Sequence, residues 1–222
     1  MILSRRTVEI IKNFSQISPN GMIWPQGNKL VVEPPTSKTM SAIAELDEEN
    51  EDRFAILDLV QFYSAISVFD KPEVELSSSQ IVISDAGQQD RGSFRFNTAS
   101  EQVIKPPRGV EFPEENAITF NFDQQMVNRL FKGIGIVAAP NIVIKGDGNN
   151  MYAMGYNPEN SGMNQFQIPL STTSKAFSYI FEVDHLNKLI KGMDYVTSIT
   201  SRGIARFRGE RVTYYVASKM LN

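Results

Sequence analysis

The stretch SRRTVEIIKNF, residues 4–14, carries the pattern that decides the fold. Four of its side chains recur at the spacing of one face of an α-helix, and they are Thr7, Ile10, Ile11 and Phe14. Ser4 stands directly before the first turn, where its hydroxyl oxygen can accept a hydrogen bond from a free backbone amide. The stretch therefore predicts an amphipathic helix that packs its apolar face on the rest of the protein.

Three further stretches repeat this spacing. They are Leu59/Phe62/Tyr63/Ile66, Val127/Leu130/Phe131/Ile134 and Leu186/Leu189/Ile190/Met193. The residues that we expect to begin these helices are Asp58, Asp123 and Asp184. Gly133 and Gly135 fall in the last turn of the third stretch, which predicts a weak end for that helix. Most of the remaining sequence alternates polar and apolar residues over short runs, as antiparallel strands do.

The order of these elements repeats along the chain. Helix, strands, helix and strands occur up to about residue 97, and the same order returns from about residue 117. The first helix maps onto the third, which aligns Lys12 with Lys132. Three prolines between the repeats, Pro106, Pro107 and Pro113, indicate an extended connector. We expect an α+β fold with one domain over residues 1–100, a connector over 101–115 and a second domain over 116–222.

The composition argues against an enzyme. The 222 residues include no cysteine, which excludes disulfides and thiolate catalysis, and His185 is the only histidine. The glycine-rich runs GIG (133–135) and KGDGNN (145–150) lack the spacing of phosphate-binding loops, and the second is typical of a hairpin turn. We therefore expect no catalysis and no cofactor.

Charge is distributed unevenly. The chain has 25 acidic against 22 basic residues, a net charge of -3 that argues against wholesale coating of nucleic acid. Six acidic residues gather in ELDEENED, residues 45–52, which we interpret as a solvated hairpin connection, with a metal site as the remote alternative. No stretch has the pattern of a signal peptide or a membrane span, so a cytoplasmic protein without membrane contact is expected.

The outward faces of the four expected helices share a property. Residues two and five positions after the start of each apolar quartet lie opposite the buried side, and they are Glu9/Lys12, Gln61/Ser64, Arg129/Lys132 and Lys188/Lys191. Three of these four faces are basic. A positive surface without base-reading side chains suits the phosphate backbone of nucleic acid. The alternative is that these charges only solvate exposed faces.

At this point the chain resembles a known family. The passages that carry the resemblance are LSRRTVEIIKNFSQI, FAILDLVQFYSAISVFD followed by IVISDA, FPEENAITFNFDQQMVNRL and FRGERVTYYVAS. They are similar to the sliding clamps of T-even-type bacteriophages, the processivity factors of DNA polymerases, which share a fold with proliferating cell nuclear antigen. The resemblance implies a DNA-clamp fold in which two similar domains each pack two helices on antiparallel sheets.

The resemblance also implies a function and partners. Three subunits would close into a homotrimeric ring around double-stranded DNA, bind the DNA polymerase, and depend on a separate ATP-driven clamp loader. The implied location is the cytoplasm of the infected bacterial host, and some relatives act in late viral transcription as well. By this resemblance the DNA-facing residues are Arg5, Lys12, Arg129, Lys132, Lys188 and Lys191, with Arg6 more peripheral.

Clamps of this fold capture short apolar tails of their partners beside the connector and the last strand. The residues that the resemblance places in this pocket are Ile104, Val110, Phe112, Tyr215, Val216 and Ala217. The segments SFRFN (93–97) and QFQIP (165–169) are the expected subunit edges. A different class of function stays open, a β-rich viral structural or assembly protein whose basic helix faces are merely solvated. A hydrolase is disfavoured because catalytic groups are missing.

Overall fold

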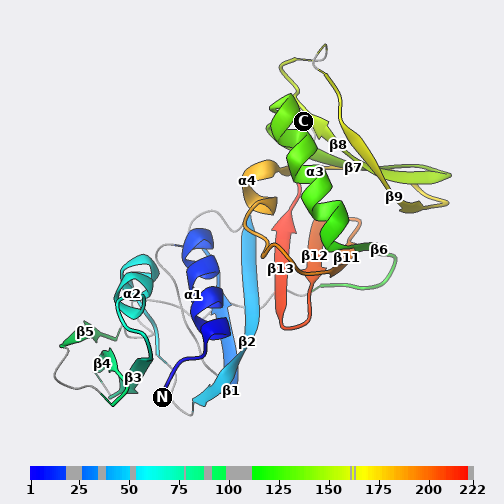
Figure 1. Ribbon diagram of the computed structural model, residues 1–222. Helices are drawn as coiled ribbons and strands as arrows, with labels where there is room; N and C mark the ends of the chain where they lie inside the picture. The colour runs from blue at the N-terminus through cyan, green and yellow to red at the C-terminus, as the bar shows by residue number, and fades with distance from the viewer. Residues whose placement is uncertain are drawn as a thin grey trace. The chain divides into compact units, whose positions relative to one another are not determined.

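The computed structural model describes residues 1–18, 27–34, 39–50, 54–77, 79–87, 92–98, 112–160, 162 and 164–219. The chain divides into two compact units, Met1–Gly109 and Val110–Asn222 (Figure 1). Most of the expected connector lies outside the described residues, so the domain boundaries at 100 and 116 stay predictions.

Unit 1 combines two helices with antiparallel strands. Its elements are α1 (Arg5–Ile17), β1 (Gly27–Val32), β2 (Met40–Asn50), α2 (Leu59–Ile66), β3 (Pro72–Leu76), β4 (Gln80–Asp85) and β5 (Ser93–Asn97). Strands β1 and β2 form an antiparallel pair, and β3, β4 and β5 form a second antiparallel group in that order. Helix α1 packs on both β2 and α2. The core of the unit therefore lies between the helices and the strands.

The start of α1 follows from its sequence. The backbone amide of Thr7 donates a hydrogen bond of 3.1 Å to Ser4 Oγ, as expected of an N-terminal cap. All four side chains of the predicted apolar face are buried, and they are Thr7, Ile10, Ile11 and Phe14. Helix α2 begins in the same way, with the Gln61 amide donating to Asp58 Oδ1 at 2.7 Å. Local sequence alone thus sets where both helices begin and which face they bury.

The acidic run has a structural role that its composition did not indicate. Strand β2 extends to Asn50, so residues 45–50 belong to a strand and not to a connection, and that part of the prediction was wrong. Residues 51 and 52 lie outside the described residues. Ser4 Oγ donates a hydrogen bond of 2.9 Å to Asp47, and Glu48 accepts hydrogen bonds from the Ser4 amide and the Thr7 hydroxyl. These carboxylates satisfy donors at the N-terminus of α1, where the helix dipole favours negative charge.

Unit 2 is richer in strands. Its elements are β6 (Ile118–Phe122), α3 (Gln124–Val137), β7 (Asn141–Asp147), β8 (Asn150–Tyr156), β9 (Gln167–Thr172), β10 (Ala176–Glu182), α4 (Val183–Leu186), β11 (Tyr195–Ile199), β12 (Ile204–Arg208) and β13 (Val212–Ala217). Within this unit the antiparallel strands follow the orders β13-β12-β11-β6 and β10-β7-β8-β9. Helix α3 packs on β8 and β9 (Figure 1).

The turn between β7 and β8 confirms the hairpin predicted at residues 145–150. Asp147 Oδ1 accepts hydrogen bonds from the amides of Asn149 and Asn150, at 2.8 and 2.7 Å. These hydrogen bonds lower the pKa of the Asp147 carboxyl below its usual range. Gly148 has φ of 96°, a conformation that glycine adopts without strain. The glycine-rich run is therefore a turn and not a phosphate-binding loop.

Helix α3 differs from its prediction at the C-terminal end. It begins at the predicted cap Asp123 and continues through both glycines to Val137, so the predicted interruption of its last turn was wrong, while the weakness expected of this end stays a prediction. The Phe166 ring lies against Gly133, where an added Cβ would come within 2.5 Å of three ring atoms. Gly133 is therefore a packing position and not a helix breaker, because its missing side chain admits the ring.

The fourth predicted helix is mostly a turn. Helix α4 ends at Leu186 and its N-cap is Glu182, so the start predicted at Asp184 was wrong. After it the amides of Lys188 and Leu189 bond back three residues, to the carbonyls of His185 and Leu186. The Tyr195 hydroxyl then donates to the Ile190 carbonyl at 2.7 Å, which holds the chain away from a helical path.

The apolar spacing of that stretch was nonetheless informative about burial. Leu186 and Leu189 are buried, whereas Ile190 and Met193 are only half-buried. Turns with hydrogen bonds between residues three apart space their side chains much as an α-helix does. The apolar pattern alone therefore did not distinguish a turn from an α-helix in this stretch.

Candidate nucleic-acid interface and partner surface

The outward face of α1 carries the charges predicted for it. Arg5, Glu9 and Lys12 are exposed, on the side opposite the buried quartet. Arg6 is exposed too, but its guanidinium lies 3.3 Å from Asp47 on β2. Exposed ion pairs contribute roughly 0 to 1 kcal/mol, so this pair mainly orients Arg6 toward β2. Arg5 and Lys12 are therefore the cations of α1 that remain for a phosphate backbone.

The outward face of α3 is positive without any acidic side chain. Arg129 and Lys132 are exposed, while Val127, Leu130 and Ile134 are buried on the opposite side. The two cations are three residues apart, which places them on neighbouring positions of one helix face. Arginine and lysine at this spacing can contact successive phosphates without reading bases.

The outward face of α2 is neutral, as its sequence predicted. Gln61 and Ser64 are exposed, and the Ser64 hydroxyl donates to the Val60 carbonyl of the same helix at 2.8 Å. Val60 itself is 45% exposed. This helix therefore offers a duplex no positive charge.

The two lysines predicted on the fourth helix lie in the turn that follows α4. Lys188 is half-buried and Lys191 is exposed. The Lys191 ammonium lies 5.9 Å from the centre of the Phe131 ring, which belongs to α3. This is within the range of a cation–π contact. The fold thus brings Lys191 beside α3 even though helix α4 ends at Leu186, before both lysines.

The predicted partner pocket divides across the two faces of β13. Tyr215 and Ala217 are half-buried on one face, whereas Val216 has no exposed surface and belongs to the core. Successive side chains of a strand point to opposite faces, so Val216 cannot line a surface pocket together with its neighbours. That part of the prediction was wrong. Ile104 and Val110 lie outside the described residues.

A cluster around Phe112 completes this surface. The Phe112 ring lies 6.1 Å from the Tyr215 ring, and the Arg206 guanidinium stacks 4.4 Å from the centre of the Phe112 ring. Arg206 also donates to Glu114 Oε1. This hydrogen bond, with the positive charge of Arg206, lowers the pKa of the Glu114 carboxyl.

Sequence reasoning missed Arg206 and Glu114. The register places Arg206 directly opposite Tyr215, across the β12–β13 pair. The alternation of IARFR could have shown that Arg206 faces away from the core. We refer to Phe112, Glu114, Arg206, Tyr215 and Ala217 together as the β13 surface.

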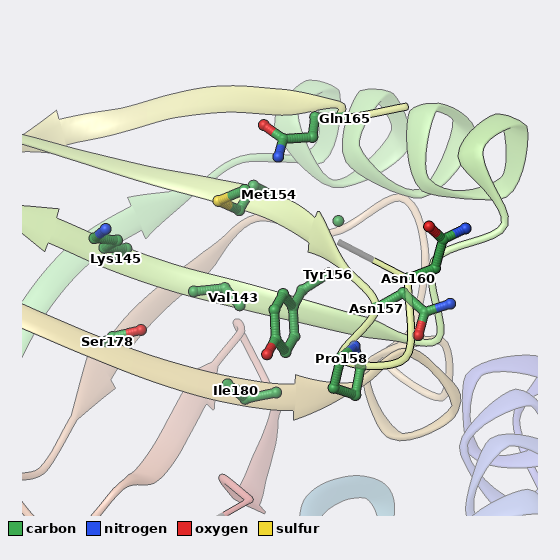
Figure 2. Close-up of a pocket in the computed structure, with 11 residues that line it drawn as sticks. Val143, Lys145, Met154, Tyr156, Asn157, Pro158, Asn160, Gln165, Ser178 and Ile180 are labelled. Carbon is green, nitrogen blue, oxygen red and sulfur yellow. The ribbon is translucent and has the colours of Figure 1, made fainter. Parts of the chain in front are cut away.

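A separate pocket of about 360 Å³ lies on the β10-β7-β8 part of the other sheet (Figure 2). Its floor is a row of cross-strand partners, Ile180, Val143 and Met154. Polar groups surround this floor, from Lys145, Tyr156, Asn157, Asn160, Gln165 and Ser178. Apolar floors with a few polar groups are typical of small binding sites, but no described lining residue carries a carboxylate or imidazole.

The described residues contain neither a candidate metal site nor a candidate membrane-spanning helix. No three histidine, cysteine, aspartate or glutamate side chains gather there in a way that could hold a metal ion. No helix in the described part of the chain is long and apolar enough to cross a membrane.

Comparison with known proteins gives the architecture a name. A putative DNA polymerase III beta subunit from Eubacterium rectale superposes with a TM-score of 0.74 at 13% identity, and covers 100% of this chain. The A. fulgidus PCNA chain, solved with the C-terminal region of FEN-1 bound, superposes with a TM-score of 0.73 at 11% identity over 100% of both chains. The chain has the DNA-clamp fold. The predicted α+β clamp architecture is therefore confirmed.

The similarity in sequence points the same way. The chain is 26% identical to the sliding clamp of Vibrio phage KVP40, over 100% of both proteins. The resemblance to phage sliding clamps is thus confirmed over the whole length. The chain spans 64% of the Eubacterium rectale beta subunit, so that clamp is substantially longer. No family model matches the chain.

Proposed function

We propose that this protein is a sliding clamp that encircles duplex DNA and tethers a DNA polymerase to it. The observation that carries the proposal is the positive outward face of α1 and α3 on a clamp fold. Arg5, Lys12, Arg129 and Lys132 are all exposed there, opposite the buried sides of their helices. Lys191, beside α3, and Lys188 would add to the DNA-facing charge of the second unit.

The proposed contacts to DNA are weak, as sliding requires. Sequence-independent phosphate contacts give dissociation constants of roughly 10⁻⁴ to 10⁻⁶ M at physiological salt, which permits sliding. A closed ring stays on DNA because of its topology, so its contacts need not be tight. The positive faces then steer and centre the duplex and do not hold it in one place.

The proposed ring is a homotrimer. Strand β5, which contains the expected edge segment 93–97, pairs only with β4 among the described strands. Strand β9, which begins within the segment 165–169, likewise pairs only with β8. Edge strands carry unpaired backbone groups that a neighbouring subunit can satisfy. We assign these two edges to the subunit contact of the ring.

The proposed partners follow from the clamp role. The DNA polymerase and other proteins would dock short apolar tails on the β13 surface. In support of docking by a chain end, the A. fulgidus PCNA chain was solved with the C-terminal region of FEN-1 bound. A separate ATP-dependent clamp loader would open the ring, and late viral transcription is a further proposed role. The protein would act in the cytoplasm of an infected bacterial cell, as a binding protein without catalysis or cofactor.

Native mass measurement tests the proposed assembly. A trimer should appear at three times the 24.9 kDa chain mass, with dissociation on dilution. A chain that stays monomeric at high concentration would contradict the ring. Charge reversal on the long helices, described below, separates a clamp from a viral assembly protein with solvated basic faces.

A further inference from the structure

Arg206 is a charged side chain in an unusually enclosed place. It lies on β12 with only 13% of its side chain exposed. A guanidinium carries a positive charge, and removing it from water is costly unless it is paired. The partners of Arg206 therefore decide what this part of the β13 surface can bind.

The partner that the chain itself supplies is exposed to solvent. Glu114, 69% exposed, comes from an irregular segment before β6. Exposed ion pairs contribute little net stability, so another carboxylate can replace Glu114 at small cost. The Phe112 ring covers one face of the guanidinium and leaves the edges of its plane available for hydrogen bonds.

Glu114 uses only part of this guanidinium. It accepts from Nη1, although the guanidinium carries five N–H donors. The Nε donor is enclosed, so the Nη groups are the donors left for a ligand. A carboxylate that takes the place of Glu114 and accepts from both Nη groups forms the strong two-bond pair that arginine favours.

The surroundings indicate the rest of the ligand. Tyr215 lies directly opposite Arg206, and Ala217 lies opposite Ile204 two residues away along the same pair of strands. These side chains give an apolar floor beside the guanidinium. Arg208, two residues further on the same face of β12, also lowers the pKa of Glu114, so its charge reaches this site. The surface is therefore complementary to an apolar side chain next to a negative one.

We propose that Arg206 recognises an aspartate or glutamate side chain of the partner peptide, and that this carboxylate displaces Glu114. The apolar neighbour of the acidic residue then lies on Tyr215 and Ala217. The inference rests on the proposed partner docking at the β13 surface, and it adds the chemical class that is selected there. Glu114 acts as an internal competitor that occupies the site until a partner arrives.

Peptide selection tests the proposal without an identified partner protein. A library of random 12-residue peptides, displayed with both ends joined to linkers so that no terminal carboxylate is free, is selected on wild-type protein and on Arg206→Gln. Wild-type protein should enrich an acidic residue beside an aromatic residue or leucine, and Arg206→Gln should lose the acidic preference. Peptides enriched without an acidic residue would overturn the inference and leave partner docking intact. No enrichment at all would overturn both.

Affinity measurements separate recognition from a structural role. Fluorescence polarisation of an enriched peptide, with an amidated C-terminus, should show roughly a tenfold or greater loss for Arg206→Gln. Replacing the peptide's acidic residue by its amide should weaken binding to wild-type protein by a similar factor and hardly at all to Arg206→Gln. An equal loss on both proteins would mean that Arg206 only supports the surface, and would contradict the proposal.

Three variants control this result. Arg208→Gln removes the same charge two residues away. It should weaken binding by no more than about threefold, because Arg208 is exposed and interactions between exposed charges are weak. Glu114→Gln should strengthen binding a few-fold by removing the competitor, and weaker binding would contradict the displacement. Arg206→Lys keeps the charge but loses the planar fork, so its affinity should stay below that of wild type. Thermal unfolding of each variant confirms that it is folded.

Discussion

The two long helices and the two short ones use their outward faces differently. Helices α1 and α3, of 13 and 14 residues, each present two cations on the side opposite their buried face. Helix α2, of 8 residues, presents a neutral face, and α4, of 4 residues, leaves its lysines to the following turn. The α2 face is neutral because its outward side chains are Gln61 and Ser64, whereas the α4 stretch loses its charged helix face because the helix ends before its lysines. In the proposed clamp, contact with DNA is concentrated on α1 and α3.

The largest expected effect comes from reversing the charge of the long helices. Lys12→Glu, Arg129→Glu and Lys132→Glu together should lower loader-dependent processive DNA synthesis by roughly tenfold or more, because phosphate contacts become repulsive. Primer-extension product lengths at several salt concentrations measure this effect. The variant should also show a weaker salt dependence than wild type, since fewer counterions are released.

The matched control alters α2, whose outward face carries no charge for DNA contact. Gln61→Ala and Ser64→Ala should leave product lengths within about twofold of wild type, since neither side chain is charged. If processivity instead survived the reversals on α1 and α3 in a folded trimer, the basic faces would be solvated surface. The viral assembly role would then be the better interpretation.

The next largest effect concerns the close contact between Gly133 of α3 and the Phe166 ring. Gly133→Ala should destabilise the protein by about 1 to 3 kcal/mol, because the new methyl group overlaps the Phe166 ring. Gly135→Ala, two residues along the same helix, meets no atom within 4 Å and should stabilise it by roughly 0.5 to 1 kcal/mol. Urea unfolding of both variants measures the difference. Equal effects would show that Phe166 does not restrict this helix.

A smaller effect should come from the turn that replaces the fourth helix. Tyr195→Phe removes the hydrogen bond to the Ile190 carbonyl and should destabilise the protein by roughly 1 to 2 kcal/mol, because a part-buried acceptor loses its partner. Burial raises the pKa of the Tyr195 hydroxyl, so it stays protonated and able to donate throughout the physiological range. Unchanged stability on urea unfolding would mean that other contacts hold the turn.

The smallest effect is a pH dependence at α4. Burial lowers the pKa of His185 below its ordinary value of 6.5, although Glu182, 3.7 Å away, opposes this. The unfolded chain therefore binds the proton more readily, so stability is present above pH 6.5 and is lost as the pH falls through the lower folded-state pKa. His185→Gln should show a smaller fall in melting temperature between about pH 7.5 and 5.5 than wild type. A parallel fall in both proteins would contradict this assignment.

The sequence predicted best where local rules decide the structure. The caps at Ser4, Asp58 and Asp123 and the buried face of α1 depend on neighbours within one or two turns, and all were predicted. The burial of Leu186 and Leu189 was predicted too, although the helix predicted around them is mostly a turn. Successive side chains of a strand point to opposite faces, so the predicted partner pocket should not have included Val216 together with its two neighbours.

Long-range contacts could not be predicted in the same way. The Phe166 ring fills the space at Gly133 from 33 residues further along the chain, and only the fold shows that the glycine is needed there. Arg206 and Glu114 meet across 92 residues of sequence. Asp47 and Glu48 likewise reach the start of α1 from a distant strand. In each case the packing of segments far apart in the sequence, which composition does not encode, brings the groups together.

Retention on circular DNA tests the central claim most directly. The protein is loaded on a nicked circular plasmid by a phage clamp loader with ATP, and the plasmid is then cut once with a restriction enzyme. If the protein is a closed ring around the duplex, it should stay with the circle through gel filtration and run off the ends after linearisation. Equal retention on circular and linear DNA would show binding by contact and not by topology, and would contradict the proposed clamp.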